Sequence, residues 1–314
     1  MMSSIDNPFG VRLVYPPKLP DKYFMKWLRE KISENKIRLN FSFDDKSTNV
    51  TDFIKNEIDN WNNSSPVFIS AQTGVGKNYF IREELLPKLI DKYHNEKNLI
   101  LLLSNRIALT RQTKLNFAER LVKFTHNDEH LKKIQNFFTP DGVDNLYIDF
   151  DVITICSYHQ MYSRKLLDYT KFKYIVCDEC HFFTSDSTFN PDTDNMLSEI
   201  VSKGQTSTRI YMSATPETAF EPIIRKEYKV LEDLKEQMKN ALENRNLRNT
   251  AYSLELLSAS LGNLQAQQNI LRDNASAWLA MQDIEGLHLE LNFYCMGRNY
   301  DYIKKFSRIK PSIN

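Results

Sequence analysis

The residues with the clearest chemical potential form a glycine-containing loop that follows the short apolar run 67–69 and ends on Lys77, where a helical pattern begins. Backbone N–H groups of such a loop surround a phosphate, the helix N-terminus adds its positive dipole, and lysine adds a charge between the outer phosphates. Gly74 and Gly76 fit, because a side chain there would block close approach or force a strained φ. The candidate phosphate-binding residues are Ala71, Gln72, Thr73, Gly74, Val75, Gly76, Lys77 and Asn78.

Two positions depart from the general pattern G-x-x-x-x-G-K-[ST]. Ala71 replaces the first glycine, and Asn78 replaces the hydroxyl residue that normally coordinates Mg²⁺. An asparagine carbonyl is also a hard oxygen ligand, so Asn78 stays a candidate magnesium ligand. A glycine-rich turn without a ligand is the alternative interpretation, but the strand–loop–helix context favours nucleotide binding.

A pair of acidic residues, Asp178 and Glu179, directly follows the apolar run 174–177. An apolar strand of this kind places its carboxylates at the carboxyl end of a parallel sheet, where such sheets bind ligands. We expect Asp178 to hold Mg²⁺, through water, and Glu179 to orient and deprotonate an attacking water. The candidate catalytic residues are therefore Lys77, Asp178 and Glu179.

The acidic pair lies inside a C-x-x-C-H pattern, Cys177 to His181, which is also the pattern of c-type haem attachment. Haem attachment calls for an exported protein, yet the first residues show no signal peptide, and strand alternation would separate the two thiols. A zinc site lacks a second C-x-x-C near Cys156 or Cys295. Buried cysteines beside a structural acidic pair are the remaining alternative. Four cysteines in 314 residues favour a reducing, cytoplasmic setting.

A third motif, Ser213-Ala-Thr215, follows the apolar run 210–212. It is informative because of its order and spacing relative to the first two motifs. Lys77 to Asp178 spans 101 residues, and Asp178 to Ser213 spans 35. With these three motifs in this order, the chain resembles the superfamily 2 DEAD/DEAH-box-like helicases, in a DECH variant. The resemblance covers about residues 60–230, which correspond to one N-terminal RecA-like domain.

The resemblance implies an ATPase that uses ATP and Mg²⁺ and binds single-stranded or duplex nucleic acid, with DNA favoured over RNA. Ser213 and Thr215 would couple the nucleotide state to strand binding. Two further loops would line a groove for the nucleic acid, and a solvated helix face is the alternative for each of their arginines. The residues implied to contact the strand are Ser104, Arg106, Thr110, Arg111, Ser157 and Tyr158.

The elements that must position these residues are short apolar runs alternating with helical stretches, which predicts an α/β fold. We expect a RecA-like P-loop domain with a mostly parallel sheet flanked by helices, plus a C-terminal helical segment. The expected division is an irregular N-terminal arm over 1–45, the ATP-binding domain over 46–230, a helical insertion or hairpin over 231–288, and a C-terminal segment over 289–314. The last could begin a linker to a second RecA-like domain.

Composition excludes two classes of protein. With 41 Lys and Arg against 40 Asp and Glu, the chain is not a strongly basic protein that binds nucleic acid through its overall charge. Its longest apolar run, 99–103, is too short to span a membrane. After Thr215 the sequence shows no Q-x-x-G-R-x-x-R run of a second RecA-like domain. We therefore expect a helicase or translocase that is truncated or lacks its second motor domain, which a partner subunit could supply. The alternative is a catalytically weak, ATP-gated module that binds nucleic acid or a partner without unwinding.

Overall fold

The computed structural model describes most of the chain, in twelve ranges. The described residues are 4–6, 12–14, 21–44, 46–94, 96–105, 113–121, 148–149, 152–164, 168–185, 192–243, 281–297 and 300–307. No helix among them combines the length and apolar character that a membrane span needs.

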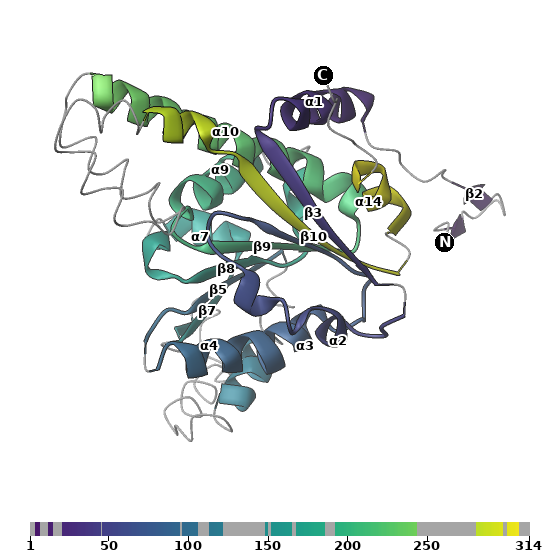
Figure 1. Ribbon diagram of the computed structural model, residues 1–314. Helices are drawn as coiled ribbons and strands as arrows, with labels where there is room; N and C mark the ends of the chain where they lie inside the picture. Colours follow the sequence, from purple (N-terminus) through teal and green to yellow (C-terminus); the bar gives the residue numbers. More distant parts are fainter. Residues whose placement is uncertain are drawn as a thin grey trace.

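A twisted eight-stranded sheet forms the centre of the molecule (Figure 1). Its strands, in spatial order, are β3 (Ile37–Asp44), β10 (Leu289–Met296), β4 (Val67–Ser70), β9 (Thr208–Ser213), β8 (Tyr174–Cys177), β5 (Ile100–Ser104), β7 (Ile153–Ser157) and β6 (Ile148–Asp149). Neighbouring strands run parallel except β6, which pairs antiparallel with β7. The expected α/β class and mostly parallel sheet are confirmed.

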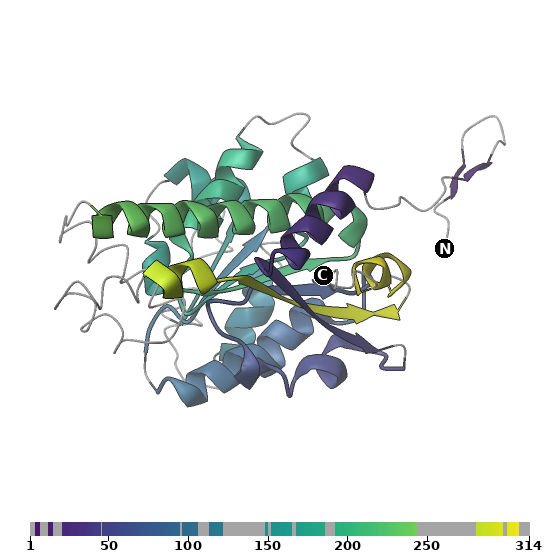
Figure 2. The ribbon, with the colours of Figure 1, turned by 45° about the horizontal axis from the view of Figure 1, so that its top comes forward.

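Helices cover both faces of the sheet, because its central strands are apolar runs buried on both sides (Figure 2). One face packs against α1 (Lys22–Ser33), α7 (Tyr158–Arg164), α8 (Phe182–Ser185), α9 (Thr193–Lys203), α10 (Pro216–Glu243) and α14 (Tyr300–Ser307). The other packs against α2 (Val50–Ile54), η1 (Ile58–Asn60), α3 (Lys77–Phe80), the π-helical turn η2 (Ile81–Leu85), α4 (Leu86–Lys92) and a helix over 113–121. A short turn, η3 (Tyr169–Lys171), precedes β8, and β1 (Ser4–Asp6) pairs with β2 (Arg12–Val14) apart from this sheet.

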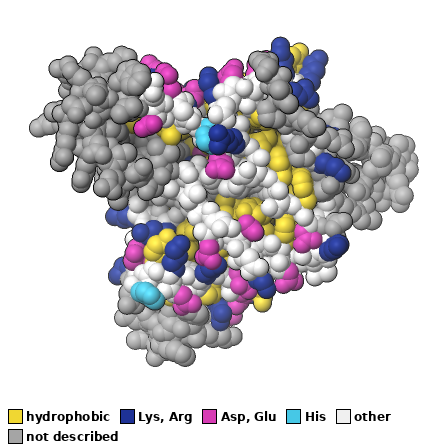
Figure 3. Space-filling model, in the orientation of Figure 1, with side chains coloured by type: hydrophobic (Ala, Val, Ile, Leu, Met, Phe, Trp, Pro, Cys, Tyr) yellow, Lys and Arg dark blue, Asp and Glu magenta, His cyan; other side chains and the backbone are white. Residues whose placement is uncertain are grey.

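Two segments that the sequence separated from the sheet contribute strands to it. β3 lies within the expected irregular arm, and β10, within the expected C-terminal segment, is inserted between β3 and β4. The difference at β3 has a physical reason. Its apolar residues alternate with polar ones, as in a half-buried edge strand, so it lacks the uninterrupted apolar run of the central strands. Figure 3 shows hydrophobic side chains at the surface over β3 and β10; the partly buried ones of β3 are Leu39, Phe41 and Phe43.

The predicted helical segment begins earlier than expected, because α10 starts at Pro216 and runs without a break through 231. Its distal half lies beside a helix over 281–286 (Figures 1 and 2). The two helices pack through Leu234, Met238 and Ile284, and Lys239 pairs with Glu285 at 3.0 Å. Residues 244–280 lie outside the described residues. The segment thus leaves the sheet after β9 and returns to it at β10, and the division into domains stays a prediction.

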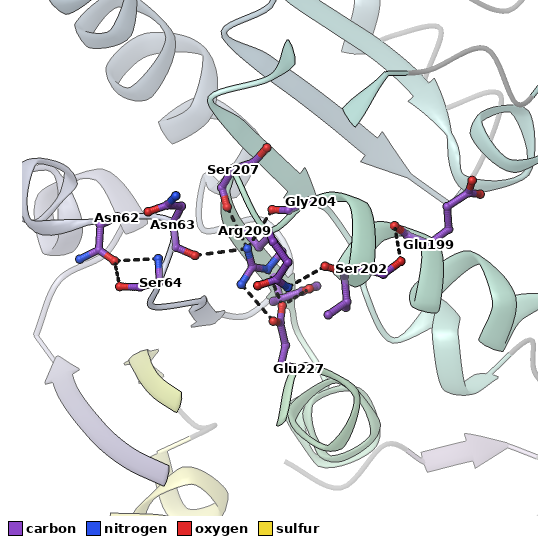
Figure 4. Close-up of polar contacts among 12 residues, drawn as sticks. Asn62, Asn63, Ser64, Glu199, Ser202, Gly204, Ser207, Arg209 and Glu227 are labelled. Carbon is purple, nitrogen blue, oxygen red and sulfur yellow. Dashed lines mark hydrogen bonds and ion pairs between the residues drawn. The ribbon is translucent and has the colours of Figure 1, made fainter. Parts of the chain in front are cut away.

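A buried polar cluster fastens α10 to β9 (Figure 4). Arg209 Nε and Nη2 donate to the two carboxylate oxygens of Glu227 at 2.7 and 3.0 Å, and the Tyr211 hydroxyl donates to the same carboxylate at 2.6 Å. Arg209 Nη1 donates to the carbonyls of Gly204 and Ser207 at 2.8 and 3.0 Å. The cluster thus joins α10 to β9 through Glu227, and removing either charged partner would leave the other buried and unpaired.

Candidate nucleotide site at the carboxyl edge of the sheet

The glycine-containing loop leaves the end of β4, a central strand between β9 and β10. Gly74 and Gly76 have φ values of 87° and 86°, the left-handed region that glycine adopts without strain. A Cβ atom built on Gly74 would meet no atom within 4 Å, so the loop is open where a ligand must approach. Ala71 is buried and anchors the loop by donating its N–H to the Ser213 carbonyl at 3.2 Å; Gln72, Val75 and Gly76 are half-buried, and Thr73, Gly74 and Asn78 are exposed.

Lys77 opens α3 and turns its side chain back toward the loop. Its ammonium group donates to the carbonyls of Ala71 and Gln72 at 3.1 and 3.3 Å, and only 7% of the side chain is exposed. The same Nζ lies 3.9 Å from Oε1 of Glu179. Residues about a hundred positions apart in sequence therefore meet at one place.

Asp178 follows β8 and is held close to the lysine. Its N–H donates to the Leu103 carbonyl at 2.8 Å, and its Oδ1 accepts the N–H of Glu179 at 3.0 Å. Burial, assisted by the charge of Glu179, raises the pKa of Asp178 to about 6, although Lys77 and a hydrogen bond from the Asn78 side chain favour the ionised form. The two candidate magnesium ligands, Asn78 and Asp178, are thus in direct contact.

Glu179 has a strained backbone, with φ at 51° for a residue that carries a Cβ. The strain is held because the turn is anchored after it, where the Cys180 N–H donates to the Met212 carbonyl at 2.9 Å. One carboxylate oxygen faces Lys77, and the other lies 3.2 Å from Nδ1 of His181. This turn directs a partly exposed carboxylate toward the phosphate loop.

The third motif joins this site to α10. The Ser213 hydroxyl accepts the N–H of Thr215 at 3.0 Å and lies 3.3 Å from the Thr215 hydroxyl, while the Ser213 carbonyl holds the phosphate loop through Ala71. Ser213 is buried and Thr215 is exposed. Ser213 thus contacts both the phosphate loop and Thr215, the residue before α10, and the coupling role of Ser213 and Thr215 stays a prediction.

The expectation that Ser157 and Tyr158 reach a nucleic acid with their side chains is wrong, because both residues are 0% exposed. The Ser157 hydroxyl accepts the N–H of Gln160 at 3.2 Å, and the Gln160 side chain accepts the N–H of Ser157 at 3.0 Å. This is a reciprocal capping box at the start of α7. The S-x-x-Q spacing in the sequence signals it. Tyr158 instead donates its hydroxyl to the Asp178 carbonyl at 2.8 Å.

The other residues implied to contact a strand are placed only in part. Ser104 ends β5 and is nearly buried, with 9% exposure. Arg106, Thr110 and Arg111 lie outside the described residues, so their expected role stays a prediction.

The cysteines of the C-x-x-C-H pattern belong to the core. Cys177 and Cys180 are both 0% exposed and unpaired, and burial raises the pKa of each thiol. Within the part of the chain that the structure describes, no group of three or more His, Cys, Asp or Glu is arranged to hold a metal ion. Core packing therefore accounts for these two thiols. His181, in contrast, contacts Glu179, a proximity that the sequence did not single out.

Comparison with known proteins agrees with this geometry. No curated protein matches the chain. The family described as "Type III restriction enzyme, res subunit" matches residues 36–218, from the residue before β3 to the first turn of α10, and so includes all three motifs. Because the match covers more than half of the 314 residues, the chain belongs to this type III restriction enzyme res subunit family and contains its helicase-like, RecA-like domain of superfamily 2.

Proposed function

We propose that this chain binds and hydrolyses ATP as the N-terminal motor domain of a helicase- or translocase-type protein. One observation carries the proposal: Lys77 Nζ lies 3.9 Å from Glu179 Oε1, beside the open phosphate loop and in contact with the Asp178 turn. A cation and two carboxylates that share one small site suit a nucleotide with its metal.

The residues present fit ATP and Mg²⁺. The positive-φ glycines leave the loop open. Asn78 and Asp178, whose side-chain oxygens are hard ligands, lie next to each other, because the Asn78 amide N–H donates to the Asp178 carboxylate. When bound, Mg²⁺·ATP would supply the phosphoryl group and the Lewis acid. Lys77 would exchange its carbonyl partners for phosphate oxygens, because charged acceptors form stronger hydrogen bonds. Glu179 would orient a water and accept its proton on a carboxylate oxygen, with His181 beside it.

We further propose that single-stranded or duplex nucleic acid, with DNA favoured over RNA, binds at the carboxyl ends of β5 and β7, where Ser104 lies and where Arg106 and Arg111 follow in sequence. A second RecA-like domain, in another part of the protein or in a partner subunit, would complete the nucleotide site with arginine. Removing such an arginine costs about 10³–10⁵ in rate in other phosphoryl-transfer enzymes, so we expect slow hydrolysis by this chain alone. Its cytoplasmic location remains a prediction from the sequence.

The test compares Lys77→Ala and Glu179→Gln with wild type and with Lys88→Ala, which changes a half-buried lysine on α4 that pairs with Asp59. A fluorescent ATP analogue reports binding, and phosphate release reports hydrolysis with and without single-stranded DNA, duplex DNA or RNA. Lys77→Ala should weaken binding by roughly tenfold or more, since it removes a buried charged donor. Glu179→Gln should retain binding and lose roughly 10²–10⁴ in turnover.

Unchanged turnover in Glu179→Gln would refute the catalytic assignment. Hydrolysis that no polynucleotide stimulates would instead support the second candidate, an ATP-gated binding module without unwinding activity.

A further inference from the structure

The side chain of Tyr158 links the start of α7 to the turn that follows β8. It begins α7 directly after β7, whereas Asp178 follows β8, and β5 lies between these two strands. The tyrosine side chain spans the end of β5 and donates its hydroxyl to the Asp178 carbonyl at 2.8 Å. Because the Tyr158 hydroxyl and the Asp178 carbonyl are both buried, water does not compete for this hydrogen bond.

The ring of Tyr158 also holds the far side of the acidic turn. It stacks on Phe182 at 4.8 Å between ring centroids with 2° between the ring planes, and it meets Phe183 edge-on, also at 4.8 Å. Both phenylalanines begin α8, immediately after the turn. Tyr158 therefore contacts the turn before and after Glu179, the residue with strained φ.

The other end of Tyr158 is fixed at the predicted nucleic-acid edge. The capping box of Ser157 and Gln160 brackets Tyr158 in sequence and sets the direction in which α7 leaves β7. A displacement of this helix start would move the Tyr158 hydroxyl and, through it, the Asp178 carbonyl.

We propose that Tyr158 is a positioning residue that transmits nucleic-acid binding at the end of β7 to the metal-binding and water-activating turn 178–181. The inference rests on the proposed function, because it assumes that the turn is catalytic and that nucleic acid binds at this edge. It assigns to Tyr158 a role inside the protein, in place of the contact to a strand expected from the sequence.

The test is Tyr158→Phe, which keeps the ring contacts and removes only the hydroxyl. The matched control is Tyr169→Phe, because Tyr169 is also buried and its hydroxyl has no hydrogen-bond partner among the described residues. Phosphate release is measured over a range of ATP concentrations, without polynucleotide and with saturating single-stranded DNA, and thermal melting checks the fold. We expect Tyr158→Phe to reduce the ratio of stimulated to basal kcat about tenfold, with KM for ATP and the melting temperature near wild type.

A second variant, Ser157→Ala, removes the cap at the nucleic-acid end and should lower the same ratio while Tyr158 stays intact. The inference is overturned if both variants keep the wild-type ratio, or if basal and stimulated rates fall in parallel, as a merely structural role would produce. Wild-type hydrolysis that depends on Lys77 but is not stimulated by DNA or RNA overturns the nucleic-acid part of the proposed function and this inference together. Normal stimulation of wild type with an unaffected ratio in the variants overturns this inference alone.

Discussion

Replacing Asp178 by asparagine is expected to stabilise the metal-free protein at neutral pH while it abolishes hydrolysis. Only 7% of the Asp178 residue is exposed, and burial raises the pKa of its carboxyl from 3.8 to about 6. The folded protein therefore disfavours the ionised form that metal binding requires. Asparagine has nearly the same shape and can still accept the Glu179 N–H, but it carries no charge to desolvate.

The pH dependence follows from the direction of this pKa change. Below about pH 4 the carboxyl is protonated in both the folded and the unfolded protein, so it costs no stability. As the pH rises from about 4 to about 6, the unfolded chain releases its proton first, and the folded state loses stability relative to it. At 1.36 kcal/mol for each tenfold change in proton affinity, the full loss is about 3 kcal/mol above pH 6. Asparagine removes this loss, but it also removes one carboxylate near Lys77. We therefore expect the free energy of unfolding of Asp178→Asn to exceed that of wild type by about 1–3 kcal/mol above pH 6.

Urea denaturation in the presence of EDTA, at intervals from pH 4.5 to 8, measures the difference in unfolding free energy between Asp178→Asn and wild type. The difference should grow up to about pH 6 and then stay level. Asp194→Asn is the control, since this exposed aspartate forms only a surface pair with Lys226 and should give little change. A difference that does not vary with pH, or a variant less stable than wild type at pH 7.5, would contradict the reasoning.

Two further predictions concern residues that support the site. Arg209→Met should lower the free energy of unfolding by about 3–5 kcal/mol in urea denaturation, because Glu227 is left buried and charged. Combining Arg209→Met with Glu227→Leu should recover part of this loss. If Arg209→Met is as stable as wild type, the pair is not needed to hold α10. Gly76→Ala should lower the free energy of unfolding by about 1–2 kcal/mol, because φ at 86° is unfavourable for alanine, and should weaken binding of the ATP analogue. Gly286→Ala is the control, since a Cβ there meets open space, and it should leave that binding unchanged. Equal binding by both variants would count against the role of the loop.

The sequence predicted the central sheet well, because its strands are built on short apolar runs and each motif lies at the end of one of them. It did not show that β10 lies between β3 and β4. That position depends on pairing between β10 and two strands that precede it by about 250 and about 225 residues, and no local pattern records which strands become neighbours. The alternating residues of β3 reflect its place at the edge of the sheet, which is also set by the complete fold.

Residue types and order along the chain predicted that Lys77, Asp178 and Glu179 share one site, because parallel strands end at one edge and bring their following residues together. The structure places Lys77 beside Glu179, and the catalytic roles stay predictions. Burial was not predictable in this way. Ser157 and Tyr158 have the chemistry to bind phosphate, yet the packing of α7 and α8 encloses them and gives them other partners. The raised pKa of Asp178 has the same origin, since desolvation depends on what surrounds a carboxyl in space. The sequence alone thus determined which groups could act on a nucleotide, and the tertiary structure decided which of them face solvent and which support the others.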